Sequence, residues 1–210
     1  MMQSPNHDIR PIRRPPDPPA GDGRPVRVLL IPGLHDSGPE HWQTWLHQRR
    51  PDAMRVEQTD WTTADLQRWS DRIGHVALQR ASVTWIAVAH SYGCLALARA
   101  IREGVCNIGA AVLVAPADPE RFGDADRLPR RPLELPCVMM ASDTDPWLPA
   151  AAARSWAHRW GARFVNLGDA GHVDAATGFG PLPQVDAMID ELTLRLTRPR
   201  QNLERAAAAA

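Results

Sequence analysis

Residues Val83 to Arg99 read VTWIAVAHSYGCLALAR, and this stretch decides the fold. It opens with a run of apolar and β-branched residues that is typical of a buried strand, and it ends with small apolar residues that favour a packed helix. Between them, Ala89-His90-Ser91-Tyr92-Gly93 predicts a sharp turn with a serine at its apex. A strand, such a turn and a helix together form the nucleophile elbow, whose usual sequence is G-x-S-x-G.

Ala89 replaces the first glycine of that motif. The residues two before and two after the serine must be small, because the strand and the helix pass close to each other at the turn. Ala89 and Gly93 both meet this demand, and alanine is the tighter fit. Five residues alone are weak evidence, since many serines simply cap helices, so a base and an acid must come from elsewhere in the chain.

Strand-like and helix-like segments alternate along the rest of the chain. Strands are predicted over residues 26–31, 54–58, 83–89, 109–115, 137–141 and 163–167, and helices from Pro39, from Thr62, and over 93–102, 149–161 and 185–196. Thr62-x-x-Asp65 resembles a capping box at the start of its helix. This alternation predicts a three-layer α/β fold, a parallel sheet covered by helices on both faces, with the ligand site beyond the carboxyl ends of the strands.

The composition is that of an ordinary globular protein, 44% hydrophobic and 23% charged, with a formal net charge of zero. This balance gives no argument for binding nucleic acid or an anionic membrane surface. All the positive charge is arginine, which excludes a P-loop lysine, a pyridoxal Schiff base and a Ser-Lys pair. The three cysteines, Cys94, Cys106 and Cys137, are predicted to be reduced core residues, and their spacing suggests no zinc site.

The two ends of the chain differ from its middle. Residues 1–25 are rich in proline and are predicted to be a disordered or extended tail, and residues 198–210 a frayed C-terminal tail. Residues 26–197 form the predicted domain, and residues 118–135 are polar and too short for a separate cap. No apolar run is long enough to span a membrane, and the N-terminus lacks a secretory pattern, so we expect a cytoplasmic protein.

An acid and a base follow later strands in the order that an α/β-hydrolase requires. Asp145 comes after the strand over 137–141, and His172 after the strand over 163–167. The order serine, acid, histidine is that of α/β-hydrolases, in which the imidazole removes the serine proton and the acid fixes its tautomer. Asp143 is the alternative acid and Asp118 a third candidate. Each of these could instead be a turn or loop residue.

Other residues near the strand ends have predicted roles. The backbone N–H groups of Tyr92 and Leu34 are the expected oxyanion donors, and Gly33 would let that backbone approach the substrate closely. His35, Trp147 and residues between Phe122 and Leu135 are the expected pocket walls. His90 is expected to point away from Ser91 as a packed or hydrogen-bonded histidine.

Several motifs occur together in this chain: Ile31-Pro32-Gly33, His41-Trp42 with Trp45, Asp60-Trp61, the elbow, SDTDPWLP over 142–149, and Gly171-His172. On these motifs the chain resembles, from about Val28 to Leu194, the small serine hydrolases of the YdeN and retinoblastoma-binding-protein-9-like family, within the α/β-hydrolase superfamily. The resemblance implies Ser91 as nucleophile, Asp145 as acid and His172 as base. It also implies a minimal core of six mostly parallel strands without a large cap domain. Ala89 departs from the glycine usual in that family but removes no functional group.

The sequence therefore predicts a serine hydrolase that cleaves small carboxylic esters, with amides or peptides as further substrates, and that needs no cofactor or metal. A protein that keeps the scaffold only to bind a partner is the alternative from another class, and it predicts a broken triad. An acyltransferase or a carbon–carbon bond hydrolase could use the same three residues. A nucleotide-binding protein would need a phosphate-binding loop, and none is found.

Overall fold

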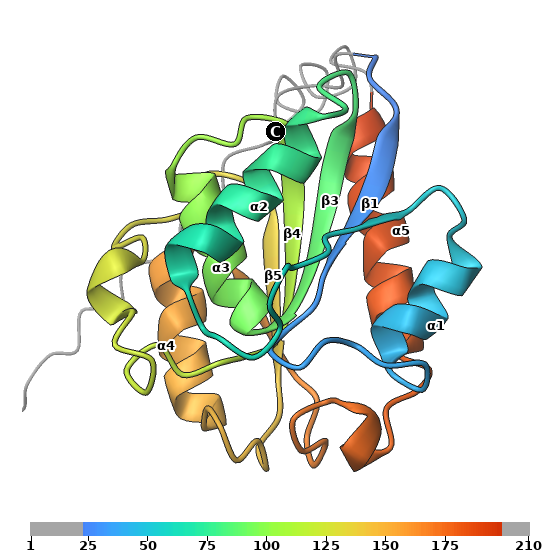
Figure 1. Cartoon of the computed structure of the whole chain (residues 1–210). Coiled ribbons are helices and arrows are strands. Elements are labelled where there is room, and N and C mark those ends of the chain that lie inside the picture. Colours follow the sequence, from blue (N-terminus) through green and yellow to red (C-terminus); the bar gives the residue numbers. More distant parts are fainter. Residues whose placement is uncertain (1–22, 199–210) are drawn as a thin grey trace, which may run out of the picture.

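The computed structural model describes residues 23–198, which contain one sheet of six parallel strands in the order β2-β1-β3-β4-β5-β6 (Figure 1). The strands are β1 (Val26–Ile31), β2 (Met54–Arg55), β3 (Thr84–Ser91), β4 (Ile108–Pro116), β5 (Cys137–Ala141) and β6 (Arg163–Asn166). The helices are α1 (Trp42–Arg49), α2 (Leu66–Leu78), α3 (Tyr92–Arg102), α4 (Ala150–Trp160) and α5 (Pro183–Thr197), with short 3₁₀ turns η1 (Ala125–Arg127) and η2 (Ala175–Thr177).

Helices cover both faces of the sheet, as the alternating pattern predicts. Helices α2, α3 and α4 pack on one face, and α1 and α5 pack on the other (Figure 1). Successive residues of the central strand β3 enter opposite layers: Trp85 and Ala87 pack with the first group, and Ile86 and Val88 with the second. A strand buried on both faces cannot alternate apolar with polar residues, which is why these strands read as continuous hydrophobic runs.

Two predicted helix starts are wrong. Helix α1 begins at Trp42 with His41 as its N-cap, so Pro39 precedes the helix. Helix α2 begins at Leu66 because the Asp65 carboxylate accepts the Arg68 N–H at 3.1 Å. The expected capping box at Thr62 does not form, since the backbone N–H and the hydroxyl of Thr62 both donate to Asp60 instead.

Other expectations can be compared with the described residues. Gly161 ends α4 in the left-handed conformation, as its position after the helical pattern predicts. Cys94 and Cys137 are buried and free, but Cys106 is exposed, so its assignment to the core was wrong; it lies in the turn between α3 and β4. Residues 1–22 and 199–210, which hold most of both predicted tails, lie outside the described range. No helix within that range is long and apolar enough to cross a bilayer.

Candidate active site

Ser91 lies at the junction of β3 and α3 in a conformation that L-residues seldom adopt, with φ 51° and ψ −124°. Its side chain makes no capping hydrogen bond to the helix, so the alternative that this serine serves only as a side-chain helix cap is excluded. A Cβ added to Gly93 would lie 2.4 Å from the carbonyl oxygen of Pro32 and 2.7 Å from that of Ile31. Only glycine fits there, because α3 crosses the end of β1 almost in contact. The strained turn that the motif predicts is present.

The structure brings Ser91, His172 and Asp145 together, although 81 residues of chain separate Ser91 from His172. Nε2 of His172 lies 2.9 Å from Oγ of Ser91, and Nδ1 of His172 lies 3.0 Å from Oδ2 and 3.1 Å from Oδ1 of Asp145. The Asp145 side chain is 1% exposed and that of His172 is 10% exposed. The carboxylate is further fixed by the backbone N–H of Trp147, which donates to Oδ1 at 2.9 Å.

The two other candidate acids lie in different surroundings. The carboxylate of Asp143 accepts the side-chain N–H of Asn166 at 3.0 Å on the exposed side of the sheet edge. Asp118 accepts the backbone N–H of Glu120 within its own loop. Among the three, the geometry therefore favours Asp145 as the partner of His172.

The loop after β1 lies directly against Ser91. A Cβ on Gly33 would stand 2.7 Å from Cβ of Ser91, so glycine is needed for this approach. His35 and Asp36 follow with φ 65° and 69°, and the His35 N–H donates to the carbonyl of Trp61 at 2.8 Å. Within residues 23–198 the N–H of Leu34 has no hydrogen-bond partner, and the N–H of Tyr92 is the first of α3, which no intrahelical carbonyl accepts.

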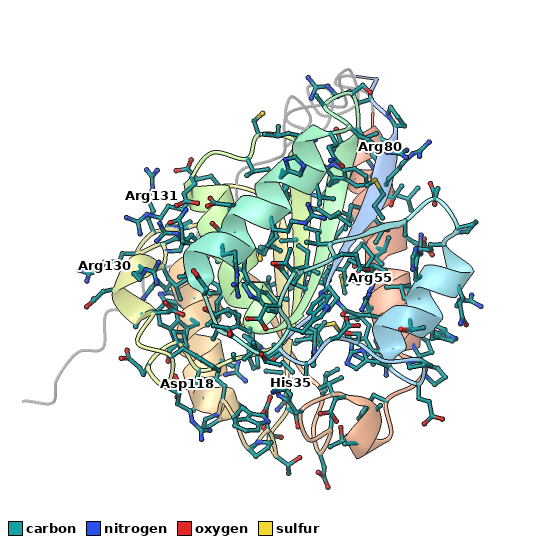
Figure 2. The ribbon with its side chains drawn as sticks, viewed as in Figure 1. His35, Arg55, Arg80, Asp118, Arg130 and Arg131 are labelled. Carbon is teal, nitrogen blue, oxygen red and sulfur yellow. The ribbon has the colours of Figure 1, made fainter. Side chains whose placement is uncertain are left out.

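A cavity of about 370 Å³ opens above Ser91. It is lined by Leu34, His35, Asp36, Gly38, His41, His90, Ser91, Ala117, Asp118, Arg121, Phe122, Trp147, His172, Asp174, Ala175 and Ala176. Figure 2 shows His35 and Asp118 in the lower part of the molecule, beyond the ends of the strands. His35 and Trp147 line this cavity, where the sequence places them, and the Arg121 guanidinium lies 4.9 Å above the Trp147 ring.

A larger cavity of about 500 Å³ lies elsewhere, between the end of α3 and the segment around residues 126–134. Arg130 and Arg131, on the far left of Figure 2, belong to this second cavity. It contains none of Ser91, Asp145 and His172, so we do not place the reaction there. Of the stretch Phe122 to Leu135, expected to contribute pocket walls, Phe122 lines the cavity above Ser91, whereas residues 126 and 128–134 line the second cavity.

Three histidines lie in series beside the cavity. The ring of His90 is 4.8 Å from that of His41 and 5.0 Å from that of His172, measured between ring centroids. Burial lowers the pKa of His41 to about 4, although the field of Asp174 opposes this shift. Burial also lowers the pKa of His90 well below its usual value. These two imidazoles are therefore neutral near pH 7, and His90 is hydrogen-bonded, to the carbonyl oxygen of His172, as expected.

Sequence reasoning missed His41, the N-cap of α1, which lines the cavity, and Gln43, which links two strands beneath it. Gln43 is fully buried, and its side-chain N–H groups donate to the carbonyls of Ile31 and Val88 at 3.2 and 3.1 Å. It thereby joins the end of β1 to β3. The only local signal was a polar residue beside Trp42 on a helix face that is otherwise buried. Within the described chain, no group of three or more His, Cys, Asp or Glu could hold a metal ion.

Comparison with known proteins defines the class. The family model described as "Serine hydrolase" matches residues 28–191, and the chain therefore belongs to the serine hydrolase family. The structure of a YdeN-like hydrolase from Pectobacterium atrosepticum is similar, with 37% sequence identity, a TM-score of 0.78, and coverage of 82% of this chain and 92% of the other. This is an esterase-like α/β-hydrolase, and within that class it is YdeN-like.

Two more distant structures share the fold. The product of the ydeN gene of B. subtilis is 19% identical, with a TM-score of 0.64, and the match covers 80% of this chain and 98% of that one. Acyl-protein thioesterase 2 of Zea mays is 14% identical, with a TM-score of 0.53, and the match covers 85% and 95%. No curated protein matches the chain in sequence. At these identities the likeness concerns the fold. Within residues 23–198 no large cap domain is seen.

Proposed function

We propose that this protein hydrolyses small carboxylic esters through Ser91, His172 and Asp145, within a catalytic domain that spans residues 26–197. The observation that carries the proposal is the chain of hydrogen bonds from Asp145 to His172 at 3.0 Å and from His172 to Ser91 at 2.9 Å. A scaffold kept only for binding has no need of such a chain at the floor of a cavity. Amides and peptides are further substrates that the same groups could cleave.

The reaction follows from where these groups lie. His172 Nε2 accepts the Ser91 proton as Oγ attacks the ester carbonyl carbon, and Asp145 stabilises the imidazolium that forms. The negative oxygen of the tetrahedral intermediate is bound by the N–H groups of Leu34 and Tyr92. The imidazolium then protonates the leaving alcohol, which leaves an acyl group on Ser91. Water, deprotonated by His172, attacks the acyl-enzyme and releases the carboxylic acid.

The substrate is a small molecule that enters the cavity above Ser91. The cavity volume of about 370 Å³ accommodates a compact ester and is at the low end for ligand pockets. Trp147 and Phe122 contribute apolar surface to the cavity wall, and Arg121 and Asp118 contribute charged groups. His35 adds an exposed polar side chain to the cavity wall; it lies on the loop after β1 that carries Leu34, here called the oxyanion loop.

A fluorophosphonate probe tests this proposal directly. The wild-type protein should be labelled, mass spectrometry should locate the adduct on Ser91, and p-nitrophenyl esters of short acyl chains should be hydrolysed. Ser91→Ala should abolish both. Ser155→Ala is the matched control, because Ser155 lies exposed on α4 and bonds only to its own helix at Ala151. Equal labelling of wild type and Ser91→Ala, or no labelling of the folded wild type, would refute the proposal.

A further inference from the structure

The turn that carries His172 is strained on both sides. Gly171 and Val173 have φ values of 52° and 51°. Glycine adopts such values freely, but a β-branched residue such as valine is a genuine outlier there. Val173 is fully buried, so its side chain cannot move to relieve the backbone strain unless the surrounding core opens. Something in the surrounding structure must hold this turn, because a residue in this conformation persists only when its neighbours over-determine it.

Two buried ring donors bind the carbonyl groups of His172 and Val173 in this turn. Nε2 of His90, from the end of β3, lies 3.0 Å from the carbonyl oxygen of His172. Nε1 of Trp42, from the start of α1, donates to the carbonyl oxygen of Val173 at 2.9 Å. The two rings also contact each other edge to face, with centroids 5.9 Å apart at 87°. Both bonds bridge segments more than eighty residues apart in the chain.

We propose that His90 and Trp42 are positioning residues for catalysis: their ring N–H groups clamp the backbone of His172 and Val173, and the clamp aims the His172 imidazole at Ser91 and Asp145. This inference rests on the proposed function of His172. If either donor is removed, a buried carbonyl loses its hydrogen-bond partner, which costs free energy in the observed conformation. The backbone at Val173 is then expected to relax toward negative φ. Such a relaxation rotates the backbone on which the imidazole is mounted.

The protonation of the clamp suits this role. Because burial keeps His90 neutral, its ring carries a single proton, and donation to the carbonyl of His172 places that proton on Nε2. Trp42 can only donate. The clamp therefore keeps the same hydrogen bonds while His172 accepts and gives up the proton of Ser91 during the reaction.

The test compares two tryptophans that lose the same kind of bond. Trp42→Phe removes the donor to Val173 and keeps most of the ring. Trp85→Phe is the control, since Trp85 is fully buried and its Nε1 donates to the carbonyl of Ala77 at 3.1 Å, at the opposite end of β3. Both should lower the melting temperature to a similar extent. We expect Trp42→Phe to lower kcat about tenfold with KM changed less than about twofold, and Trp85→Phe to leave kcat within about twofold of wild type.

A second pair of variants tests His90 by rescue. His90→Leu removes the donor at nearly constant volume and should lower kcat about tenfold. His90→Gln should recover most of that loss, because the glutamine Nε2 stands at the same number of bonds from the backbone as the histidine Nε2. Equal kcat values for Trp42→Phe and Trp85→Phe, or a His90→Gln variant no better than His90→Leu, would overturn the clamp.

A spectroscopic reading separates this inference from the proposed function. The proton on Nδ1 of His172 is hydrogen-bonded to Asp145 and should give a low-field proton resonance in the folded protein, assigned by its loss in Asp145→Asn. Trp42→Phe should broaden or shift it, while Trp85→Phe should not. If the wild type proves inactive toward esters and the probe, the proposed function falls, and this resonance alone decides whether the clamp orients the ring: unchanged in Trp42→Phe, it refutes the clamp.

Discussion

Asp145→Asn is the substitution whose outcome the structure defines most closely. Oδ1 of Asp145 accepts the Trp147 N–H at 2.9 Å and lies 3.1 Å from Nδ1 of His172, and Oδ2 is the nearer oxygen to that nitrogen, at 3.0 Å. An asparagine must keep its carbonyl oxygen toward the Trp147 N–H, because its NH₂ group there would meet another donor. The NH₂ group then faces Nδ1 of His172.

That orientation forces the wrong tautomer on the base. Facing an NH₂ donor, Nδ1 of His172 must become an acceptor, so the ring proton moves to Nε2. Nε2 lies 2.9 Å from the Ser91 hydroxyl and can no longer accept its proton. The same change removes the negative charge that stabilises the imidazolium. In a comparable triad such a replacement lowers kcat about 10⁴-fold, which corresponds to about 5 kcal/mol of transition-state stabilisation.

Asp143→Asn supplies the matched control, since it makes the same chemical change two residues away. The Asp143 carboxylate is bound by Asn166 and does not reach His172. We expect its kcat on a p-nitrophenyl ester to stay within about threefold of wild type. Both variants should be assayed beside circular dichroism spectra that confirm folding. A larger loss in Asp143→Asn, or an Asp145→Asn enzyme within tenfold of wild type, would refute the assignment of the acid.

Three further outcomes are expected. Gly33→Ala places a methyl group 2.7 Å from Cβ of Ser91, so the oxyanion loop must shift, and kcat/KM should fall about 100-fold in a steady-state assay; a wild-type rate would contradict this. Tyr92→Phe removes the 2.9 Å hydrogen bond from the hydroxyl to the buried carboxylate of Asp124, and urea unfolding should show a loss of about 1–3 kcal/mol. His41 is neutral in the folded protein down to about pH 4, whereas in the unfolded chain it binds a proton below about pH 6.5. Stability should therefore decrease as pH falls from 6.5 to 4, by about 3 kcal/mol from this residue, and urea unfolding of His41→Asn, which keeps a capping side chain, should show a flatter pH dependence.

The sequence was sufficient for features that depend on local pattern. Each strand buried on both faces carries its own apolar run, and β5 covers the predicted residues Cys137–Ala141 without change. The convergence of Ser91, Asp145 and His172 could be predicted because each lies at or after the end of a strand. Parallel strands place their carboxyl ends at the same edge of the sheet. Such features can be predicted without knowing any tertiary contact.

Features that depend on contacts between distant residues could not be predicted. Nothing near Trp42 in the sequence indicates that its indole binds a carbonyl 131 residues further along. The strain at Val173 is equally hidden, since valine at a left-handed position contradicts local preference. The true start of α2 was missed for a related reason: Thr62 and Asp65 both resemble caps, but Thr62 donates its N–H and hydroxyl to Asp60, and Asp65 caps the helix.

The elbow explains why Ala89 is compatible with the motif. Position 89 is an ordinary strand position, in register with Ile31 on one side and Leu113 on the other, and it does not have a positive φ. Its requirement is volume alone, and a methyl group is fully buried there. Gly93 is different, because any Cβ would meet the carbonyl oxygens of the neighbouring strand end at 2.4 and 2.7 Å. The two small positions of the motif are therefore small for different reasons, and only the second requires glycine. Since the conformational strain is borne by Ser91 itself, an alanine two residues earlier leaves the geometry of the nucleophile intact.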